Sequence, residues 1–394
     1  MIELFLLETS TANPDPQVLE EESGWRLTQE RAGSARVSLG QRALGRLIAL
    51  DPRQRYWAFY PAPGVNARGE VAVMVDRSTY FDRLWLSPPL LACFWEKLVA
   101  SGTRYSFSYL VYAREHSFRK QLEERIEETE VEPERTVITV AASSSSIRRA
   151  GGPLLSGLPL PTALAAVKVQ SDTGYLYLSR AGYLRISSEE LGEDVPELIA
   201  AYSRATALIE ARLGQMAVGS RAERSGAVAA GLEPDAGEGK APVSAGRTWP
   251  GAAPDPDAPG DEDEGVGQLR RRGLPLTLLF SEPLPPSILA SFLAWLDEGG
   301  GSLRLWGRGK RVGEQRWQVR ALDLHLRREV ELELSPRQLV FVWPPGACGN
   351  SLHRAVTHML YHLDPRARVF VGNRRYEDLL RDAFAPAGSH SEDG

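Results

Sequence analysis

The sequence has few cysteines and lacks any apolar run long enough to span a bilayer. The 394 residues include two cysteines, Cys93 and Cys348, which excludes a disulfide-rich secreted scaffold and favours a reducing compartment. A membrane-spanning helix needs about 20 consecutive apolar residues, and the start of the chain carries only Leu4-Phe5-Leu6-Leu7 between two glutamates. We therefore expect no signal peptide, no membrane partner and a cytoplasmic protein.

Complete metal and catalytic motifs are also missing. The sequence contains no Gly-x4-Gly-Lys-Ser/Thr loop and no His-Glu-x-x-His helix. His358 and His362 share one flank of a predicted helix and His353 lies on the other, so the three histidines cannot bind one ion together. We predict no metal site and no cofactor. A site formed by His358, His362 and a distant carboxylate remains an alternative, as does a nucleophilic role for Cys348.

The residues that are present have the balance of a globular protein. Apolar residues make up 43% of the chain and charged residues 25%, so most of it can bury a core. The exception is 216–268, which is rich in Gly, Ala, Pro and Asp and has one aromatic residue, Trp249. Such a segment cannot bury enough apolar surface to offset its ordering entropy. We therefore predict an N-terminal domain (1–215), a disordered acidic linker (216–268), a C-terminal domain (269–383) and a disordered tail (384–394).

The net charge of −5 is distributed unevenly over these parts. Residues 1–215 carry 24 basic and 27 acidic residues, the linker 4 and 10, residues 269–383 carry 18 and 12, and the tail adds two acidic residues. The net charges are therefore −3, −6, +6 and −2. Because charge asymmetry bears on partners rather than on fold, we expect the linker to compete for the basic surface of the C-terminal domain.

Helical and strand periodicities alternate in both domains, which predicts an α+β (mixed α/β) fold of two lobes with largely antiparallel sheets and packed helices. Residues 167–187 have a period of two interrupted by two glycine turns, which predicts a three-strand meander. We expect further strands at 2–7, 56–60, 71–75, 105–112, 136–141, 276–280, 302–306, 317–326, 329–334, 339–343 and 368–371. We expect helices at 41–50, 88–101, 116–130, 189–214, 285–298, 351–363 and 376–384.

One helix pattern occurs twice. Residues 86–102 align without gaps on 284–300, with identical leucine, proline, phenylalanine and glycine positions. An ancient duplication would explain this, and so would the chance likeness of two amphipathic helices that begin at proline and end at glycine.

Two segments could bind an anion. The loop and helix start at 344–354 combine a strand end with a helix N-terminus, and the candidate residues there are Gly346, Gly349, Asn350, Ser351 and Arg354. The loop 143–152 supplies Ser144, Ser146 and Arg148. The alternatives are a plain strand–loop–helix connection at 344–354 and a mobile surface loop at 143–152.

The C-terminal domain also carries basic residues interleaved with aromatic ones, among them Arg308, Lys310, Arg311, Arg374 and Arg375. This composition suits contacts with nucleic-acid backbones and bases, although the sequence contains no recognisable nucleic-acid-binding motif. Without a complete catalytic set, we expect a non-catalytic interaction or regulatory protein that binds another protein. A nucleic-acid-binding module in 269–383 is one alternative, and a phosphate- or nucleotide-handling enzyme centred on 344–354 is another.

Overall fold

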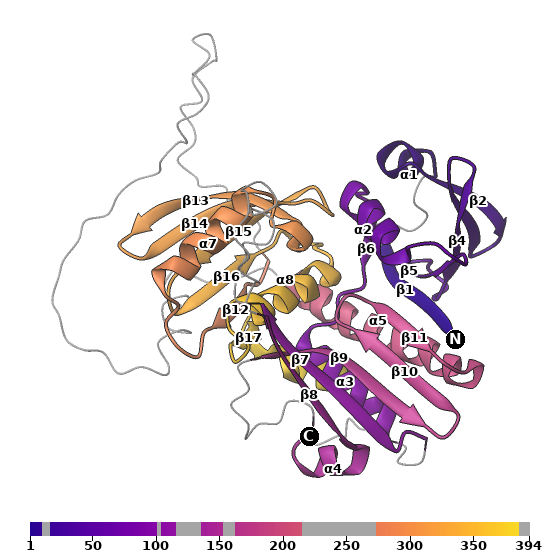
Figure 1. Ribbon diagram of the computed structural model, residues 1–394. Coiled ribbons are helices and arrows are strands. Elements are labelled where there is room, and N and C mark those ends of the chain that lie inside the picture. The colour runs from indigo at the N-terminus through magenta and orange to yellow at the C-terminus, as the bar shows by residue number, and fades with distance from the viewer. Residues whose placement is uncertain (10–15, 101–103, 116–134, 153–161, 215–272, 386–394) are drawn as a thin grey trace, which may run out of the picture.

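The computed structural model describes residues 1–9, 16–100, 104–115, 135–152, 162–214 and 273–385 (Figure 1). Eight α-helices and two antiparallel sheets are formed by these residues, which confirms the predicted α+β fold of two lobes. None of the described helices is long and apolar enough to cross a membrane. The expected helix at 116–130, the whole of the expected linker and most of the expected tail lie outside the described residues.

The N-terminal lobe is built on a sheet whose strand order is β2-β3-β4-β5-β1-β11-β10-β9-β7-β8, with β6 paired to β1. Its strands are β1 (Ile2–Thr9), β2 (Trp25–Arg31), β3 (Ser34–Leu39), β4 (Arg42–Ala49), β5 (Tyr56–Pro61), β6 (Phe81–Arg83), β7 (Phe107–Glu115), β8 (Arg135–Ser143), β9 (Ala163–Ser171), β10 (Gly174–Ser179) and β11 (Tyr183–Ile186). Strands β9, β10 and β11 form the predicted meander.

Strand β1 is buried on both faces, which explains its unbroken apolar run. Leu4 and Leu6 point into the large core of the molecule, whereas Phe5 and Leu7 point into a smaller core on the other side of the sheet. Helices α1 (Pro16–Ser23) and α2 (Ala67–Arg77) contribute side chains to this smaller core. The remaining helices of the lobe are α3 (Pro88–Ala100), α4 (Ser144–Arg149) and α5 (Asp194–Leu213), the last preceded by a 3-10 turn η3 (Glu189–Glu193).

The C-terminal lobe is built on a second sheet, ordered β13-β14-β15-β16-β12-β17-β18. Its strands are β12 (Leu276–Leu279), β13 (Leu305–Gly313), β14 (Arg316–Asp323), β15 (Arg328–Leu334), β16 (Gln338–Val342), β17 (Arg368–Val371) and β18 (Arg374–Arg375). Its helices are α7 (Pro286–Asp297), α8 (Gly349–His362) and α9 (Tyr376–Phe384), with a short 3-10 turn η4 (Gly301–Leu303). The two similar sequence stretches form α3 and α7, and each helix packs on a strand, β9 and β13 respectively.

Three local predictions were wrong. The expected helix at 41–50 is strand β4, and the expected strand at 71–75 is part of helix α2. In α2 the side chain of Asn66 accepts a hydrogen bond from the Gly69 backbone N–H, which caps the helix start. The expected surface loop at 143–152 contains helix α4, which the Ser143 side chain caps in the same way through Ser146.

The two lobes share one core. The large hydrophobic cluster extends from Leu4 in β1 to Ala383 in α9. Helix α8 packs against α5 and β7, and α9 packs against α3 and α5, so two helices of the second lobe lie on the first (Figure 1).

The chain leaves the N-terminal lobe and enters the C-terminal lobe at nearly the same point. A Cβ atom added to Gly273 would lie 2.5 Å from the Leu213 carbonyl oxygen. The ends of the undescribed segment 215–272 are therefore adjacent. The predicted domain boundaries at 216–268 remain a prediction, because that segment lies outside the described residues.

Candidate functional site

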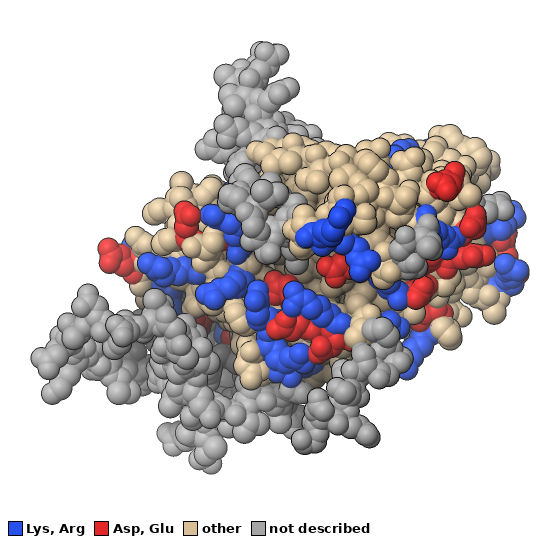
Figure 2. All heavy atoms as spheres, turned by 90° about the horizontal axis from the view of Figure 1, so that it is seen from below, with Lys and Arg blue, Asp and Glu red and all other residues tan. Residues whose placement is uncertain are grey.

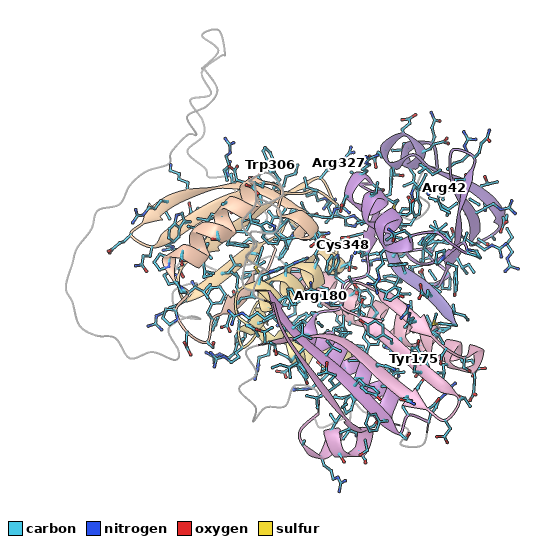
Figure 3. The ribbon with its side chains drawn as sticks, in the orientation of Figure 1. Arg42, Tyr175, Arg180, Trp306, Arg327 and Cys348 are labelled. Carbon is cyan, nitrogen blue, oxygen red and sulfur yellow. The ribbon has the colours of Figure 1, made fainter. Side chains whose placement is uncertain are left out.

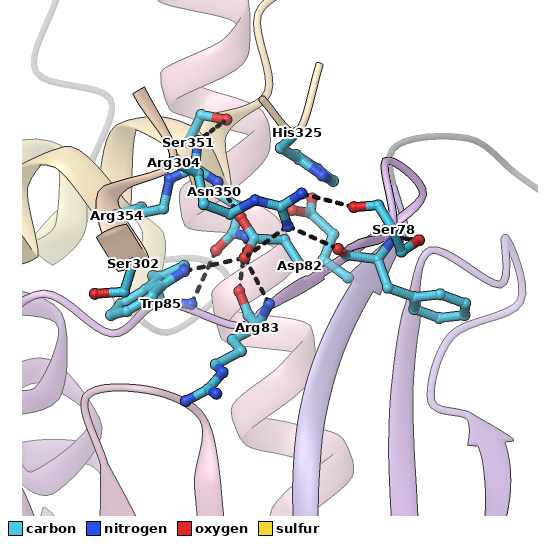
Figure 4. Close-up of polar contacts among 12 residues, drawn as sticks. Ser78, Asp82, Arg83, Trp85, Ser302, Arg304, His325, Asn350, Ser351 and Arg354 are labelled. Carbon is cyan, nitrogen blue, oxygen red and sulfur yellow. Dashed lines mark hydrogen bonds and ion pairs between the residues drawn. The ribbon is translucent and has the colours of Figure 1, made fainter. Parts of the chain in front are cut away.

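Arg354 is the centre of a buried ion-pair network between the lobes (Figure 4). Its guanidinium group is paired with Asp82 of β6 and lies 2.9 Å from the Asp323 carboxylate of β14. Arg304 donates to the backbone carbonyls of Ser78 and Phe81 at 2.6 and 3.1 Å. Burial alone would raise the pKa of Asp82, but the charges of Arg354 and Arg304 hold it below its ordinary value.

Asn350, in the first turn of α8, joins the same interface. Its side-chain oxygen accepts hydrogen bonds from the Trp85 backbone N–H at 2.9 Å and the Tyr202 hydroxyl at 2.7 Å. Its side-chain nitrogen donates to the Arg83 carbonyl at 2.9 Å. These three hydrogen bonds of the amide group hold α8 against β6 and α5.

A second polar cluster lies at the N-terminus of α8, around Cys348, which Figure 3 shows in the middle of the molecule. The Cys348 thiol donates to the Glu8 carboxylate, with sulfur–oxygen distances of 3.1 and 3.3 Å. Arg55 donates to Glu8 through Nε at 2.7 Å and to Glu210 through a terminal nitrogen at 3.0 Å. Glu210 in turn accepts the Gly349 backbone N–H at 2.8 Å.

His325, in the turn between β14 and β15, completes this cluster. The ligand atoms of Glu8, His325 and Cys348 all lie within 4.8 Å of one another, and all three residues are buried. Among the described residues, these three form the single group of three or more His, Cys, Asp or Glu side chains that lie close enough together to bind a metal ion.

Burial dominates the titration of these three groups. It raises the pKa of Glu8 to about 7, above the ordinary value of 4.5, despite the neighbouring Arg55 charge. It lowers the pKa of His325 from 6.5 to about 4 and raises the pKa of the Cys348 thiol well above its ordinary value. Burial therefore disfavours the charged form of each of the three groups.

The structure places the predicted anion-binding residues in two separate places. Asn350, Ser351 and Arg354 are buried in α8, and Arg354 is already neutralised by two carboxylates. The helix N-terminus does have an anion, but it is the protein's own Glu210 at Gly349. The Gly346 carbonyl lies 3.4 Å from the Arg328 guanidinium group. An external phosphate at this helix start would have to displace Glu210.

The second predicted set lies on α4, far from α8 (Figure 1). Ser144 is buried and its hydroxyl lies 2.8 Å from that of Ser108. Ser146 accepts a hydrogen bond from Ser143 at 2.7 Å, and Arg148 donates to the Val99 carbonyl at 3.4 Å. These contacts give each side chain a partner within the lobe.

The predicted nucleic-acid-binding residues occupy opposite edges of the second sheet. Arg308, Lys310 and Arg311 lie on β13, the first strand in the order, and Arg374 and Arg375 lie on β18, the last. Arg308 pairs with Asp297 at 2.7 Å. Arg374 pairs with Asp382 at 2.7 Å and Arg375 with Glu377 at 3.7 Å. The two basic groups are therefore separate surfaces.

Two of the three α8 histidines are buried within the fold. His353 and His358 are at most 1% exposed. The His353 ring contacts the hydroxyls of Tyr376 and Thr206, and the His358 ring stacks on His362 with 5.7 Å between ring centres. Tertiary packing covers both flanks of the helix.

A large cavity of about 1130 Å³ lies elsewhere, between α3, α5 and α9. Its charged lining is partly occupied by ion pairs, including Lys97–Glu197 at 2.6 Å and Arg104–Asp194 at 3.1 Å. Its lining includes Ala100, Arg104 and Ala385, which are the described residues that border the segments 101–103 and 386–394 in sequence. It is separate from the Cys348 cluster, none of whose members lines it.

Sequence reasoning missed Glu8, Arg55, Asp82, Glu210 and Asp323. One signal was available for Glu8, an acidic residue that directly continues a buried apolar run in β1. A buried acid of this kind requires a partner, but nothing in the sequence identifies that partner. Asp82 and Arg354, for example, are 272 residues apart.

Comparisons with known proteins give one result. A family model described as MJECL33-like protein matches residues 261–378, which include most of the C-terminal lobe. No curated protein and no solved structure matches the chain.

Proposed function

We propose that this chain is a non-catalytic, cytoplasmic interaction protein that binds another protein through strand β13. The observation that carries the proposal is the position of β13 at one edge of the second sheet, with no strand beyond it among the described residues. An exposed edge strand can pair with an extended segment of a partner through main-chain hydrogen bonds.

The side chains of β13 support this role. Trp306 is 50% exposed, and together with Arg308 and Lys310 it points to the same side of the strand because their positions differ by even numbers. Val312, which is 45% exposed, lies where the pairing register of β13 shifts between Arg311 and Gly313. Trp306 lies on the outside of the molecule in Figure 3. Exposed tryptophan and arginine are the side chains that most often dominate protein interfaces. We expect a partner segment with alternating acidic and apolar residues.

Nucleic acid is the second candidate ligand, favoured by the basic residues of β13. Neighbouring acidic residues argue against nucleic-acid binding, because Glu329, Glu331 and Glu333 lie on β15. The β14 residues paired with them include the basic Arg320, so this part of the sheet carries both signs of charge. The face of the molecule in Figure 2 likewise mixes basic and acidic side chains. Nucleic acid binds better to a surface of one sign, so mixed charge favours a protein partner.

The experiment is affinity capture with the full chain, followed by quantitative binding of the captured protein. Trp306→Ala should weaken that binding by roughly 30-fold, or about 2 kcal/mol, as expected for an interface hot spot. Leu208→Ala on α5 is the control, since Leu208 is 42% exposed on another element, and it should bind as the wild type does.

Three results would contradict the proposal. Equal binding by the Trp306 and Leu208 variants would exclude β13 as the interface. Salt-dependent retention of the full chain on RNA or DNA, lost in an Arg308→Glu/Lys310→Glu variant, would favour nucleic acid instead. Turnover of a phosphoester substrate by the full chain would favour the enzyme alternative at 344–354.

The acidic segment 216–268 is proposed to regulate this surface, because its charge of −6 is attached directly to the basic C-terminal part. Deleting residues 250–265 should therefore raise the affinity of the full chain for heparin at low salt. An unchanged affinity would remove the regulatory role while leaving the interface proposal in place.

A further inference from the structure

We propose that Glu8, His325 and Cys348 form a binding site for a thiophilic divalent cation, and that Zn²⁺ is the ion that fits it. The first observation is geometric. The three ligand atoms lie within 4.8 Å of one another in a buried position. This site is independent of the interface proposed on β13.

The second observation is the state of His325. Its side chain is buried, with 1% exposure, and neither ring nitrogen has a hydrogen-bond partner among the described residues. A buried imidazole without a partner is costly, and an ion is one of the explanations for such a group. A metal ion bound to one ring nitrogen would give His325 a partner. The residues that would provide the other ligands, Glu8 and Cys348, are directly adjacent.

The donor set selects the ion. Thiolate, imidazole and carboxylate are all zinc ligands, whereas Mg²⁺ and Ca²⁺ prefer oxygen donors alone. Two ligands at about 2.0 and 2.3 Å from one tetrahedral zinc ion are roughly 3.5 Å apart. The Cys348–Glu8 sulfur–oxygen distance of 3.1 Å is already close to this value. The His325 ligand atom lies within 4.8 Å of the other two, and with three protein ligands one coordination position would remain for water.

Charge balance also supports a dication. On binding, the Cys348 thiol loses its proton to solvent and becomes a thiolate, and any proton on Glu8 is released. Glu8, Glu210 and Cys348 then carry three negative charges. One charge is balanced by Arg55, which contacts both carboxylates, and two by Zn²⁺. The nearby Arg304–Arg354–Asp82–Asp323 network is neutral by itself.

The three proposed ligands come from both lobes, so the site lies between them. Glu8 comes from β1 of the first lobe, whereas His325 and Cys348 come from the β14–β15 turn and the loop before α8 of the second. A bound ion would therefore cross-link the two lobes and add its binding free energy to the stability of the folded state.

The test uses the full chain, purified in reducing buffer and stripped of metal by a chelator. Co²⁺ is then titrated as a spectroscopic substitute for Zn²⁺. We expect about one ion per chain, a thiolate-to-cobalt charge-transfer band in the near ultraviolet, and displacement of the cobalt by Zn²⁺. Absence of this band in the wild-type chain would overturn the proposal, whatever the behaviour of any variant.

Variants identify the ligands. Cys348→Ser should abolish the charge-transfer band, and His325→Gln should weaken binding at least about a hundredfold, because losing even an outer-shell partner costs about 10–100-fold. Cys93→Ser is the matched control, since Cys93 is the other free buried cysteine, and it should keep the band. A band lost in Cys93→Ser and kept in Cys348→Ser would also overturn the site.

Discussion

The positive charge of Arg354 is buried away from water, where it is paired with the carboxylates of Asp82 and Asp323. The side chains of Arg354, Asp82 and Asp323 are each at most 1% exposed. Removing one partner of such a buried pair leaves an uncompensated charge, which costs far more than the loss of an exposed pair. The stability of the lobe interface therefore depends on this residue.

We expect Arg354→Met to lower the free energy of unfolding by about 3–5 kcal/mol. The control is Arg381→Met, because Arg381 is 65% exposed in its pair with Asp378 and should cost less than about 1 kcal/mol. Urea denaturation of both variants is the measurement. Similar losses in the two variants would show that the buried network does not hold the lobes together.

His353 makes stability depend on pH. Burial lowers its pKa from 6.5 to about 3. Below pH 6.5 the histidine therefore binds a proton in the unfolded chain but stays neutral in the folded chain. Stability therefore falls as the pH is lowered through this window, by up to about 1.4 kcal/mol per pH unit for this histidine. The measurement is urea denaturation of metal-free protein between about pH 7.5 and 5. The free energy of unfolding of His353→Gln should depend less steeply on pH than that of the wild type, by the slope that corresponds to uptake of about one proton on unfolding.

Thr206→Val is the control for this measurement. The Thr206 hydroxyl lies 3.4 Å from Nε2 of His353, so the variant removes a contact of the ring without removing the titrating group. It should keep the wild-type pH dependence. Equal slopes for wild type and His353→Gln would mean that other groups account for the acid sensitivity.

At the scale of single elements, β4 shows how a strand can imitate a helix in sequence. Leu44 and Leu47 are both buried although they are three residues apart, which is helical spacing. In the sheet, Val37 faces Gly45 and Ser38 faces Ala43, so Leu44 is an extra residue in a β-bulge. The bulge turns both leucines to the same side, and the periodicity alone could not reveal it.

Helix α2 shows the opposite error. Three alternating valine positions at 71, 73 and 75 suggest a strand, but Val73 is 45% exposed while Val71, Met74 and Val75 are buried. Burial at i, i+3 and i+4 is the helical pattern. Tertiary packing against the smaller core decides between the two, and the cap at Asn66 was the local signal that favoured a helix.

The candidate site was partly predictable. The sequence predicts a helix from 351, close to the observed start at Gly349, and a helix N-terminus favours negative charge because of its local backbone geometry. The anion itself, Glu210, is 139 residues away from Gly349. The ligands proposed for the metal likewise come from three distant segments, so only the assembled fold brings them together.

At the scale of the whole molecule, the shared core makes the two lobes interdependent. Apolar residues of α8 and α9 belong to the same cluster as those of β1, β9 and α5. Separating the lobes would expose these helix faces to water, at roughly 25 cal/mol for each Å² of apolar surface. Neither lobe can open independently without this cost.

We therefore expect the two lobes to unfold together. Hydrogen exchange measured by mass spectrometry across a urea series should show that β9 and β16 lose protection at the same urea concentration. Residues near the exposed end of β13 serve as the internal comparison, since they should exchange at lower urea by fraying. Loss of protection in β16 well before β9 would show that the C-terminal lobe is an independent folding unit.

The close approach of Leu213 and Gly273 affects how freely the length of the chain between them can change. Because the intervening segment departs and returns at one point, its length is not dictated by any distance that it must bridge. Closing a loop becomes costlier only with the logarithm of its length, at about 0.6 kcal/mol for each doubling. Insertions and deletions between residues 215 and 272 are thus nearly neutral for the folded body, and a whole additional protein could be grafted there as cargo.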